Sequence, residues 1–203
     1  KQASIADQAN YYYYAQTFYS ELLIKYLHLP TEDGNEDQRT EKIDGVITSL
    51  SILIWRWIQS QSSEGQKQQI NISQYIFARC VLLILTIQNE DTVETAQKFV
   101  SVFKSSPPDS IDSELIFKLP LFHFVDFFIK AIDKKSKKTA DFLMKKYEPA
   151  LNVDSDLVEY ANTAKENLNS RDVSGLSGLG SMLQSFLGRM LSGNDNDNNN
   201  NKS

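Results

Sequence analysis

Apolar residues recur along most of this chain at intervals of three and four, which is the spacing of one face of an α-helix. The most apolar segment is residues 118–133, and its polar residues form one narrow stripe, made of His123, Asp126, Lys130 and Asp133. A helix that is apolar over most of its circumference needs neighbours on at least two sides. We interpret this aromatic helix either as the central helix of a layered stack or as a helix with part of its surface reserved for a partner. It is too short and too often interrupted by charge to span a membrane.

The same periodicity predicts helices along the rest of the chain up to residue 168. We expect them over residues 5–28, 43–59, 71–88, 92–104, 113–117, 119–133, 137–147 and 154–168. A short turn of helix ends before Pro120, and a long helix starts near Leu119, because proline is tolerated only in the first turn of a helix. Polar residues without apolar spacing predict loops over residues 31–41 and 60–69.

From residue 71 onward the helices come in pairs, and the segments that open them start near residues 71, 112 and 152. An interval of about 40 residues is the period of a two-helix solenoid repeat. We therefore predict an all-α fold: a right-handed helical-repeat solenoid of antiparallel helix pairs, like TPR or HEAT repeats, that ends in a disordered C-terminal tail.

A change of composition divides the chain into two predicted parts, an α-solenoid domain over residues 1–172 and a tail over residues 173–203. The Asn-rich end, residues 194–203, is typical of a disordered segment. Residues 174–191 instead carry leucine, methionine and phenylalanine at helical spacing, interrupted by glycine. We interpret them either as a tail that folds back on the array or as a helix that orders on a protein or membrane surface.

Charge and cysteine content limit the function classes. The formal net charge is -5, and the one short basic run, residues 134–138, is interpreted as a solvated turn between helices. A nucleic-acid partner is therefore not expected, since phosphate binding requires concentrated lysine and arginine. The single cysteine, Cys80, allows no disulfide within the chain, which fits a reducing compartment such as the cytosol. The sequence starts without methionine and without a secretory leader, and we interpret it as a fragment or a processed chain.

No catalytic, cofactor-binding or metal-binding constellation is found in the sequence. His28 and His123 have no Cys or acidic partner at ligand spacing, and the acidic segment 31–41 lacks the ligand alternation of a calcium loop. Cys80 lies on an apolar helix face and is interpreted as a small core residue. We therefore expect a protein that is not an enzyme and that uses no cofactor.

Three motifs carry a resemblance to a known family. They are Phe-Ala-Arg-Cys-Val-Leu at residues 77–82, Leu-Pro-Leu-Phe-His-Phe-Val at residues 119–125, and Phe-Leu-Met-Lys-Lys-Tyr-Glu-Pro-Ala-Leu at residues 142–151. Together with the Gly/Leu/Met segment up to Leu191, they resemble the C-terminal half of the Golgi-to-ER traffic protein 4 family. This family supplies a subunit of the transmembrane-domain recognition complex.

The resemblance implies an all-helical solenoid without catalytic activity. It implies a cytosolic adaptor that bridges chaperone and targeting factors for the insertion of tail-anchored proteins into the ER membrane, and that is not an integral membrane protein. The C-terminal half of the family binds a ubiquitin-like-domain protein or a large ubiquitin-like chaperone scaffold. The targeting ATPase docks on the N-terminal half of the family, and the resemblance implies that this chain lacks most of that half.

We place the predicted partner groove at the start of the aromatic helix and in the segment before it, on Leu115, Phe117, Leu121, Phe122 and Phe124. Two other classes stay open. A generic helical-repeat scaffold of another assembly predicts a large interface without preference for ubiquitin-like partners. A membrane-surface protein that uses residues 176–191 predicts liposome binding that depends on this segment.

Overall fold

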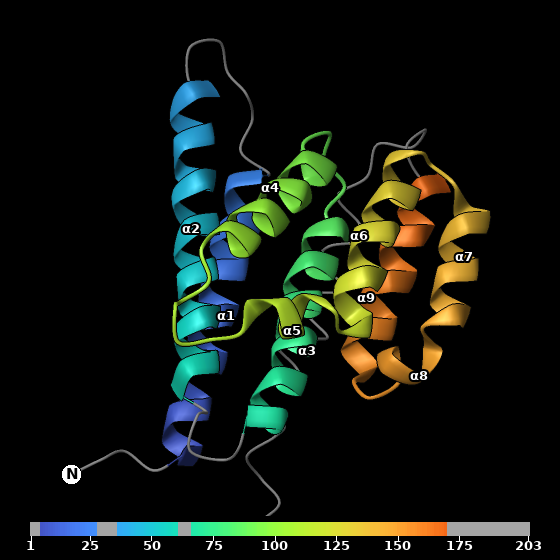
Figure 1. Ribbon diagram of the computed structural model, residues 1–203. Coiled ribbons are helices and arrows are strands. Elements are labelled where there is room, and N and C mark those ends of the chain that lie inside the picture. Colours follow the sequence, from blue (N-terminus) through green and yellow to red (C-terminus); the bar gives the residue numbers. More distant parts are fainter. Residues whose placement is uncertain (1–4, 28–35, 61–65, 170–203) are drawn as a thin grey trace, which may run out of the picture. The chain divides into compact units, whose positions relative to one another are not determined.

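The chain divides into two units, Lys1–Asn169 and Ser170–Ser203, and the computed structural model describes residues 5–27, 36–60 and 66–169 of the first. These ranges are helical, without a strand, and the connections between helices are turns and short loops (Figure 1). The all-α class is therefore confirmed for the described part of the chain. The predicted tail, residues 173–203, lies outside the described residues, so the domain boundary and the disorder of the tail stay predictions.

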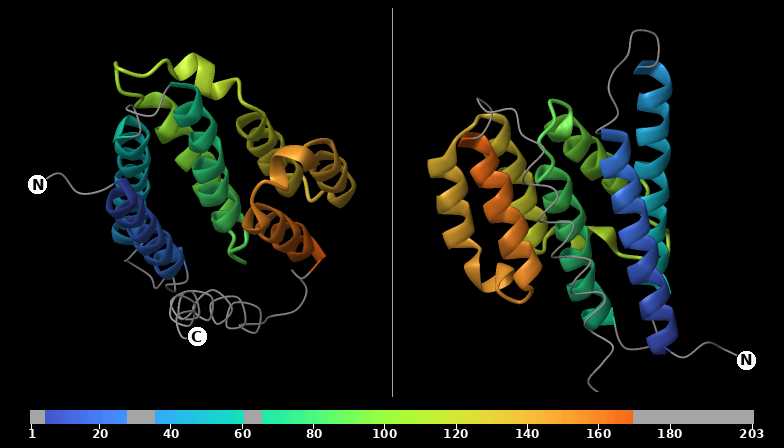
Figure 2. Two further views of the ribbon diagram at one scale, coloured as in Figure 1. Left: turned by 90° about the horizontal axis from the view of Figure 1, so that it is seen from below. Right: turned by 180° about the vertical axis from the view of Figure 1, so that it is seen from behind.

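Nine α-helices and one 3-10 turn make up the described ranges. In chain order they are α1 (Ile5–Leu27), α2 (Glu36–Ser60), α3 (Gln66–Leu85), α4 (Thr92–Ser105), α5 (Ser113–Phe117), α6 (Pro120–Asp133), α7 (Lys137–Lys146), α8 (Glu148–Leu151), α9 (Ser155–Glu166) and η2 (Asn167–Asn169). Successive long helices such as α1 and α2, or α6 and α7, run antiparallel and pack side by side (Figure 2). This arrangement is compatible with an α-solenoid. None of the helices in these ranges has both the length and the apolar character needed to cross a membrane.

Helix α3 is the central element of the described unit. It packs against α1, α2 and α4 on one side and against α5, α6 and α9 on the other (Figure 2). Its apolar side chains are buried around most of the helix, which is the pattern of a helix enclosed by neighbours. The buried residues include Phe77, Ala78, Val81, Leu82, Ile84 and Leu85.

The aromatic helix α6 has α3 on one side and α7 on the other, so the expected need for two neighbours is confirmed. Helix α9 follows α6 and α7 in the chain, but it packs mainly along α3 and not along α6. The reason is that α7 and the short helix α8 already cover the side of α6 that faces away from α3.

Helix α2 begins at Glu36, so the prediction of a loop over residues 31–41 is wrong for its last six residues. This polar first part of α2 has one buried side chain before Ile43, which is Arg39. This part of the sequence has no apolar stripe, because its inward-facing residue is Arg39, a hydrogen-bonded cation, and not a hydrophobic residue. Likewise, α3 begins at Gln66, inside the predicted loop 60–69.

Arg39 joins the C-terminal end of α1 to the loop between α3 and α4. Its Nε and Nη2 donate to the backbone oxygens of Tyr26 and Leu27, each at 3.1 Å, and its Nη1 lies 2.7 Å from Asp91 Oδ2. The side-chain amide of Asn89 also donates to Leu27 O. The last carbonyls of a helix have no partner within that helix, so these bonds satisfy groups that would otherwise be buried unpaired.

A second polar joint ties α9 to α3. Arg79 on α3 forms ion pairs with Asp154, the N-cap of α9, and with Asp156. Burial disfavours the charged guanidinium, but the two carboxylates outweigh it and raise the pKa of Arg79. At the other end of α9, the amide of Asn167 donates to Thr86 O at 2.7 Å. The ends of α9 are thus held along α3 by directed polar contacts.

We expect Arg39→Ala to lower the free energy of unfolding by about 2–3 kcal/mol, because it leaves two helix-end carbonyls and a carboxylate without their charged donor. Chemical denaturation followed by circular dichroism measures this change. Arg56→Ala is the matched control, since Arg56 is exposed on the same helix, and it should change stability by less than about 0.5 kcal/mol. Equal effects of the two substitutions would contradict the role given to Arg39.

Candidate partner-binding site

The region predicted to bind a partner is a corner formed by α5 and α6. Helix α5 is a single turn that starts after Asp112, whose side chain accepts a hydrogen bond from the backbone N–H of Leu115 at 3.4 Å. Leu119 is extended, with φ -71° and ψ 149°, as expected for a residue before proline, and Pro120 opens α6. The predicted split into a short and a long helix is confirmed.

A cluster of stacked rings lies beneath this corner. We call it the aromatic cluster, and its members come from α2, α3, α4, α5 and α6: Trp55, Phe77, Phe99, Phe103, Phe117 and Phe122. The ring of Phe77 lies 4.4 Å from that of Phe122 and 4.8 Å from that of Phe103, between centroids. Such offset and tilted pairs add to the free energy gained by burial.

Trp55 attaches α2 to the aromatic cluster in two ways. Its indole ring stacks on Phe103, with centroids 4.3 Å apart and planes inclined by 8°. Its Nε1 also donates a hydrogen bond of 3.1 Å to the backbone oxygen of Phe103. The buried indole N–H is therefore satisfied, as a buried tryptophan requires.

Helix α5 covers the outer edge of the aromatic cluster. The ring of Phe117 stands nearly perpendicular to that of Phe122, at 72° and 5.5 Å, and is half-buried. Ile116 is completely buried, whereas Leu115 is 47% exposed. The corner thus presents Leu115, with the edge of Phe117 beside it, on a base of packed aromatic rings.

The other predicted site residues lie in the interior. Leu121 is buried, and its backbone N–H donates to the buried Gln74 Oε1 on α3 at 3.3 Å, which satisfies one of the free amides at the start of α6. Phe122 is a member of the aromatic cluster and is 1% exposed. Phe124 is buried on another side, where its ring lies 5.6 Å from that of Tyr147 and 5.0 Å from that of Phe128.

The five predicted residues therefore separate by position. Leu115 and Phe117 reach the surface, Leu121 and Phe122 lie beneath them, and Phe124 faces away toward α7 and α8. A direct role in binding stays a prediction for all five.

On α6 and α7, two exposed phenylalanines were not identified from the sequence as surface residues. Phe127 on α6 is 47% exposed and Phe142 on α7 is 64% exposed. A signal for Phe127 was present, because it lies four residues after His123 and three before Lys130, and therefore on the polar stripe of the aromatic helix. Phe142 lies in a helix whose outward positions are mostly charged, which also places it on the surface.

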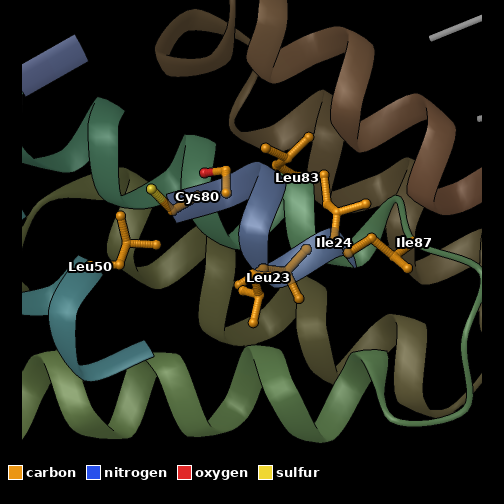
Figure 3. Close-up of a pocket in the computed structure, with 8 residues that line it drawn as sticks. Leu23, Ile24, Leu50, Cys80, Leu83 and Ile87 are labelled. Atoms are coloured by element: carbon orange, nitrogen blue, oxygen red, sulfur yellow. The ribbon is translucent and has the colours of Figure 1, made fainter. Parts of the chain in front are cut away.

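A small apolar pocket lies between α1, α2 and α3 (Figure 3). Leu23 and Ile24 approach it from α1, and Cys80 and Leu83 from α3 (Figure 3). It leaves no room for a water molecule. We therefore regard it as a packing defect of the core and not as a ligand site.

Cys80, which lines this pocket, is a buried core residue, as expected. Burial raises the pKa of the Cys80 thiol to about 12, although Gln16 donates a hydrogen bond of 3.2 Å to its sulfur. The thiol is therefore neutral at physiological pH and is not activated as a nucleophile. Within the described ranges, His, Cys, Asp and Glu side chains form no group of three or more that could hold a metal ion. His28 lies outside those ranges.

Comparison with known proteins places this arrangement in a family. A family model described as Golgi to ER traffic protein 4 matches residues 43–187, which is more than half of the chain. It covers most of α2 and all of α3 to α9. The suspected resemblance is confirmed. No curated protein matches the sequence.

We expect the Cys80 thiol to resist a water-soluble disulfide reagent in the folded protein at about pH 9, where an exposed thiol is largely ionised, and to react at once in denaturant. The raised pKa means that Cys80 favours the folded state below pH 9.0 and that this contribution is lost as the pH rises toward about 12. Labelling of the native chain as fast as that of the denatured chain would contradict its burial.

We expect Phe122→Ala to lower the free energy of unfolding by about 3–5 kcal/mol, because it removes a ring from the centre of the aromatic cluster and leaves a cavity. The matched control is Phe142→Ala, the same change at a ring that is 64% exposed. It should cost less than about 0.5 kcal/mol. Denaturant titration measures the free energy of unfolding of both variants. A decrease for Phe122→Ala as small as that for Phe142→Ala would contradict the conclusion that the aromatic cluster supports the corner.

Proposed function

This chain belongs to the Golgi to ER traffic protein 4 family, and on that premise we propose that it is a non-enzymatic cytosolic adaptor in the delivery of tail-anchored proteins to the ER membrane. It bridges chaperone and targeting factors and carries no cofactor. Its helices form a right-handed solenoid of antiparallel pairs, similar to TPR or HEAT repeats. The family match and the paired antiparallel helices support this proposal.

The observation that carries the proposed site is the exposure of Leu115 on a rigid base. Its helix α5 has only one turn, which does not hold its shape in isolation. Here the turn is capped by Asp112 and anchored by the completely buried Ile116. An apolar anchor that is already ordered loses little conformational entropy on binding, which favours affinity. We therefore assign direct partner contact to Leu115 and Phe117.

The three buried members of the predicted site have a supporting role in this proposal. Leu121 and Phe122 hold the start of α6 against α3, through the Gln74 hydrogen bond and the aromatic cluster. Phe124 anchors α6 to the turn at Tyr147. Substitution of these buried residues would weaken partner binding only because it unfolds or distorts the protein. The test of binding therefore has to use the exposed residues.

The partner that we assign to the corner is the ubiquitin-like-domain protein, or the ubiquitin-like chaperone scaffold, implied by the family resemblance. A compact domain with a small apolar patch fits a single exposed leucine with an aromatic edge beside it, since a few central apolar residues supply most of the energy of such interfaces. Docking of the targeting ATPase is assigned to the N-terminal half of the family and not to this corner.

A specific observation also favours the alternative of a scaffold subunit in a larger assembly. Tyr14 and Phe18 lie one helical turn apart on α1 and are 64% and 59% exposed. An apolar stripe of this kind favours a further protein contact. Sedimentation velocity of the purified chain distinguishes the two classes, since the scaffold alternative requires concentration-dependent assembly without the ubiquitin-like partner.

We expect Leu115→Asp to weaken binding of the ubiquitin-like-domain protein at least about tenfold, because it places a charge at the centre of an apolar contact. Isothermal titration calorimetry measures the affinity, and the melting curve verifies that the variant is folded. The matched control is Val153→Asp, since Val153 is 63% exposed between α8 and α9, and it should bind like the unmodified chain. Unchanged affinity of folded Leu115→Asp would refute the proposed site.

A further inference from the structure

The outer end of the α6–α7 pair carries a positive charge that the rest of the chain does not share. Residues 130–146 contain seven lysines and two aspartates, a net charge of +5, whereas the chain as a whole has a net charge of -5. The remaining residues therefore carry -10. All seven lysines are exposed, and we call the surface that they form with Phe142 the lysine-rich face.

The helix geometry gathers these lysines around Phe142. On α7, Lys138, Lys145 and Lys146 lie four residues before and three and four residues after Phe142, and therefore on the same helix face. Of the two aspartates, Asp141 points toward α9, where Lys165 Nζ lies 2.8 Å from its Oδ1. The lysines nearest to Phe142 are thus not neutralised by the acidic residue beside it.

The turn between α6 and α7 adds further lysines to the same end of the pair. Lys134 is the C-cap of α6, and the left-handed backbone of Lys135 in the following turn, with φ 51°, reverses the chain direction. Ser136 then caps α7 by accepting a hydrogen bond from Thr139 N. On α6 itself, Lys130 Nζ lies 5.7 Å from the centre of the exposed Phe127 ring, so the combination of lysine and phenylalanine recurs on the neighbouring helix.

The shape of this surface selects between two kinds of anionic partner. An acidic peptide needs a groove, but the contact between α6 and α7 is filled by buried side chains such as Phe128 and Leu143, and by the packing of Phe124 on Tyr147. Phe142, which is 64% exposed, therefore lies outside this filled contact. All the cations between residues 130 and 146 are lysines, which attract negative charge as point charges, whereas arginine forms directed, paired bonds with carboxylates.

We propose that the lysine-rich face docks on an anionic lipid surface, with Phe142 entering the headgroup region. Exposed lysines are attracted to the negative potential of such a surface, and an aromatic side chain at its edge adds apolar burial. The acidic remainder of the chain is repelled, so the same charge distribution orients the protein. This proposal is independent of the partner site at Leu115, which lies on another helix.

The test is co-sedimentation of the full chain with vesicles of phosphatidylcholine and phosphatidylserine, compared with vesicles of phosphatidylcholine alone. We expect binding only to the anionic vesicles, and loss of that binding at high salt. The triple variant Lys138→Gln, Lys145→Gln, Lys146→Gln should reduce vesicle partitioning on the order of a hundredfold, since each lysine near the surface contributes roughly fivefold.

Matched controls test whether vesicle binding depends on these particular lysines and on Phe142, and not only on net charge or on any exposed ring. The triple variant Lys25→Gln, Lys42→Gln, Lys118→Gln has the same net charge, changes three exposed lysines elsewhere, and should bind like the unmodified chain. Phe142→Ala should weaken binding severalfold, whereas Phe18→Ala, at a ring that is 59% exposed on α1, should not.

Three results would overturn the proposal. The first is absence of binding to anionic vesicles. The second is binding that persists in the folded triple variant at residues 138, 145 and 146, because the lipid contact would then lie elsewhere in the chain. The third is capture of a polyglutamate peptide without vesicle binding, which would identify the face as a site for acidic protein segments.

Discussion

The packing of aromatic rings around Phe77 is the interaction on which the described fold depends. Phe77 lies on the central helix α3, and its ring packs against rings of α4 and α6. These rings in turn contact Trp55 of α2 and Phe117 of α5. Each ring removes a large apolar area from water, and the stacked and tilted geometries add a further gain. One cluster therefore joins five consecutive helices, α2 to α6, and it also supplies the base for the one-turn helix α5. The proposed partner site is held in place by this cluster, because Phe117 of α5 packs on Phe122.

Directed polar contacts then determine how the helix ends meet. Arg39 closes α1 against α2 and the α3–α4 loop, Arg79 holds the start of α9, and Gln74 accepts from the start of α6. Each contact satisfies backbone or charged groups that would be costly to bury alone. Apolar packing alone tolerates several registers of neighbouring helices, whereas these contacts are satisfied in one arrangement. Packing thus supplies most of the stability, and the polar joints specify the geometry.

Features set by local geometry and apolar spacing could be predicted from the sequence, whereas features set by polar contacts and by the choice of neighbouring helices could not. The break at Pro120 and the high burial of α6 depend on local geometry and on apolar spacing, so both were predicted correctly. The start of α2 was missed because its inward residue is Arg39, which carries no apolar signal. The packing of α9 on α3 and the burial of Phe122 depend on which helices become neighbours, and helical spacing does not determine that. Phe127 shows the converse, since a hydrophobic residue in an apolar helix can lie on the exposed face.

We propose that the corner of α5 and α6 is a preformed contact for a ubiquitin-like partner. Hydrogen exchange of the full chain with and without the ubiquitin-like-domain protein tests it most directly, because it reports on backbone amides along the chain without any substitution. We expect slower exchange on binding for the amides of residues 113–119 and of Leu121, around Leu115 and Phe117. Unchanged exchange in this segment, with protection confined to another helix such as α1, would contradict it.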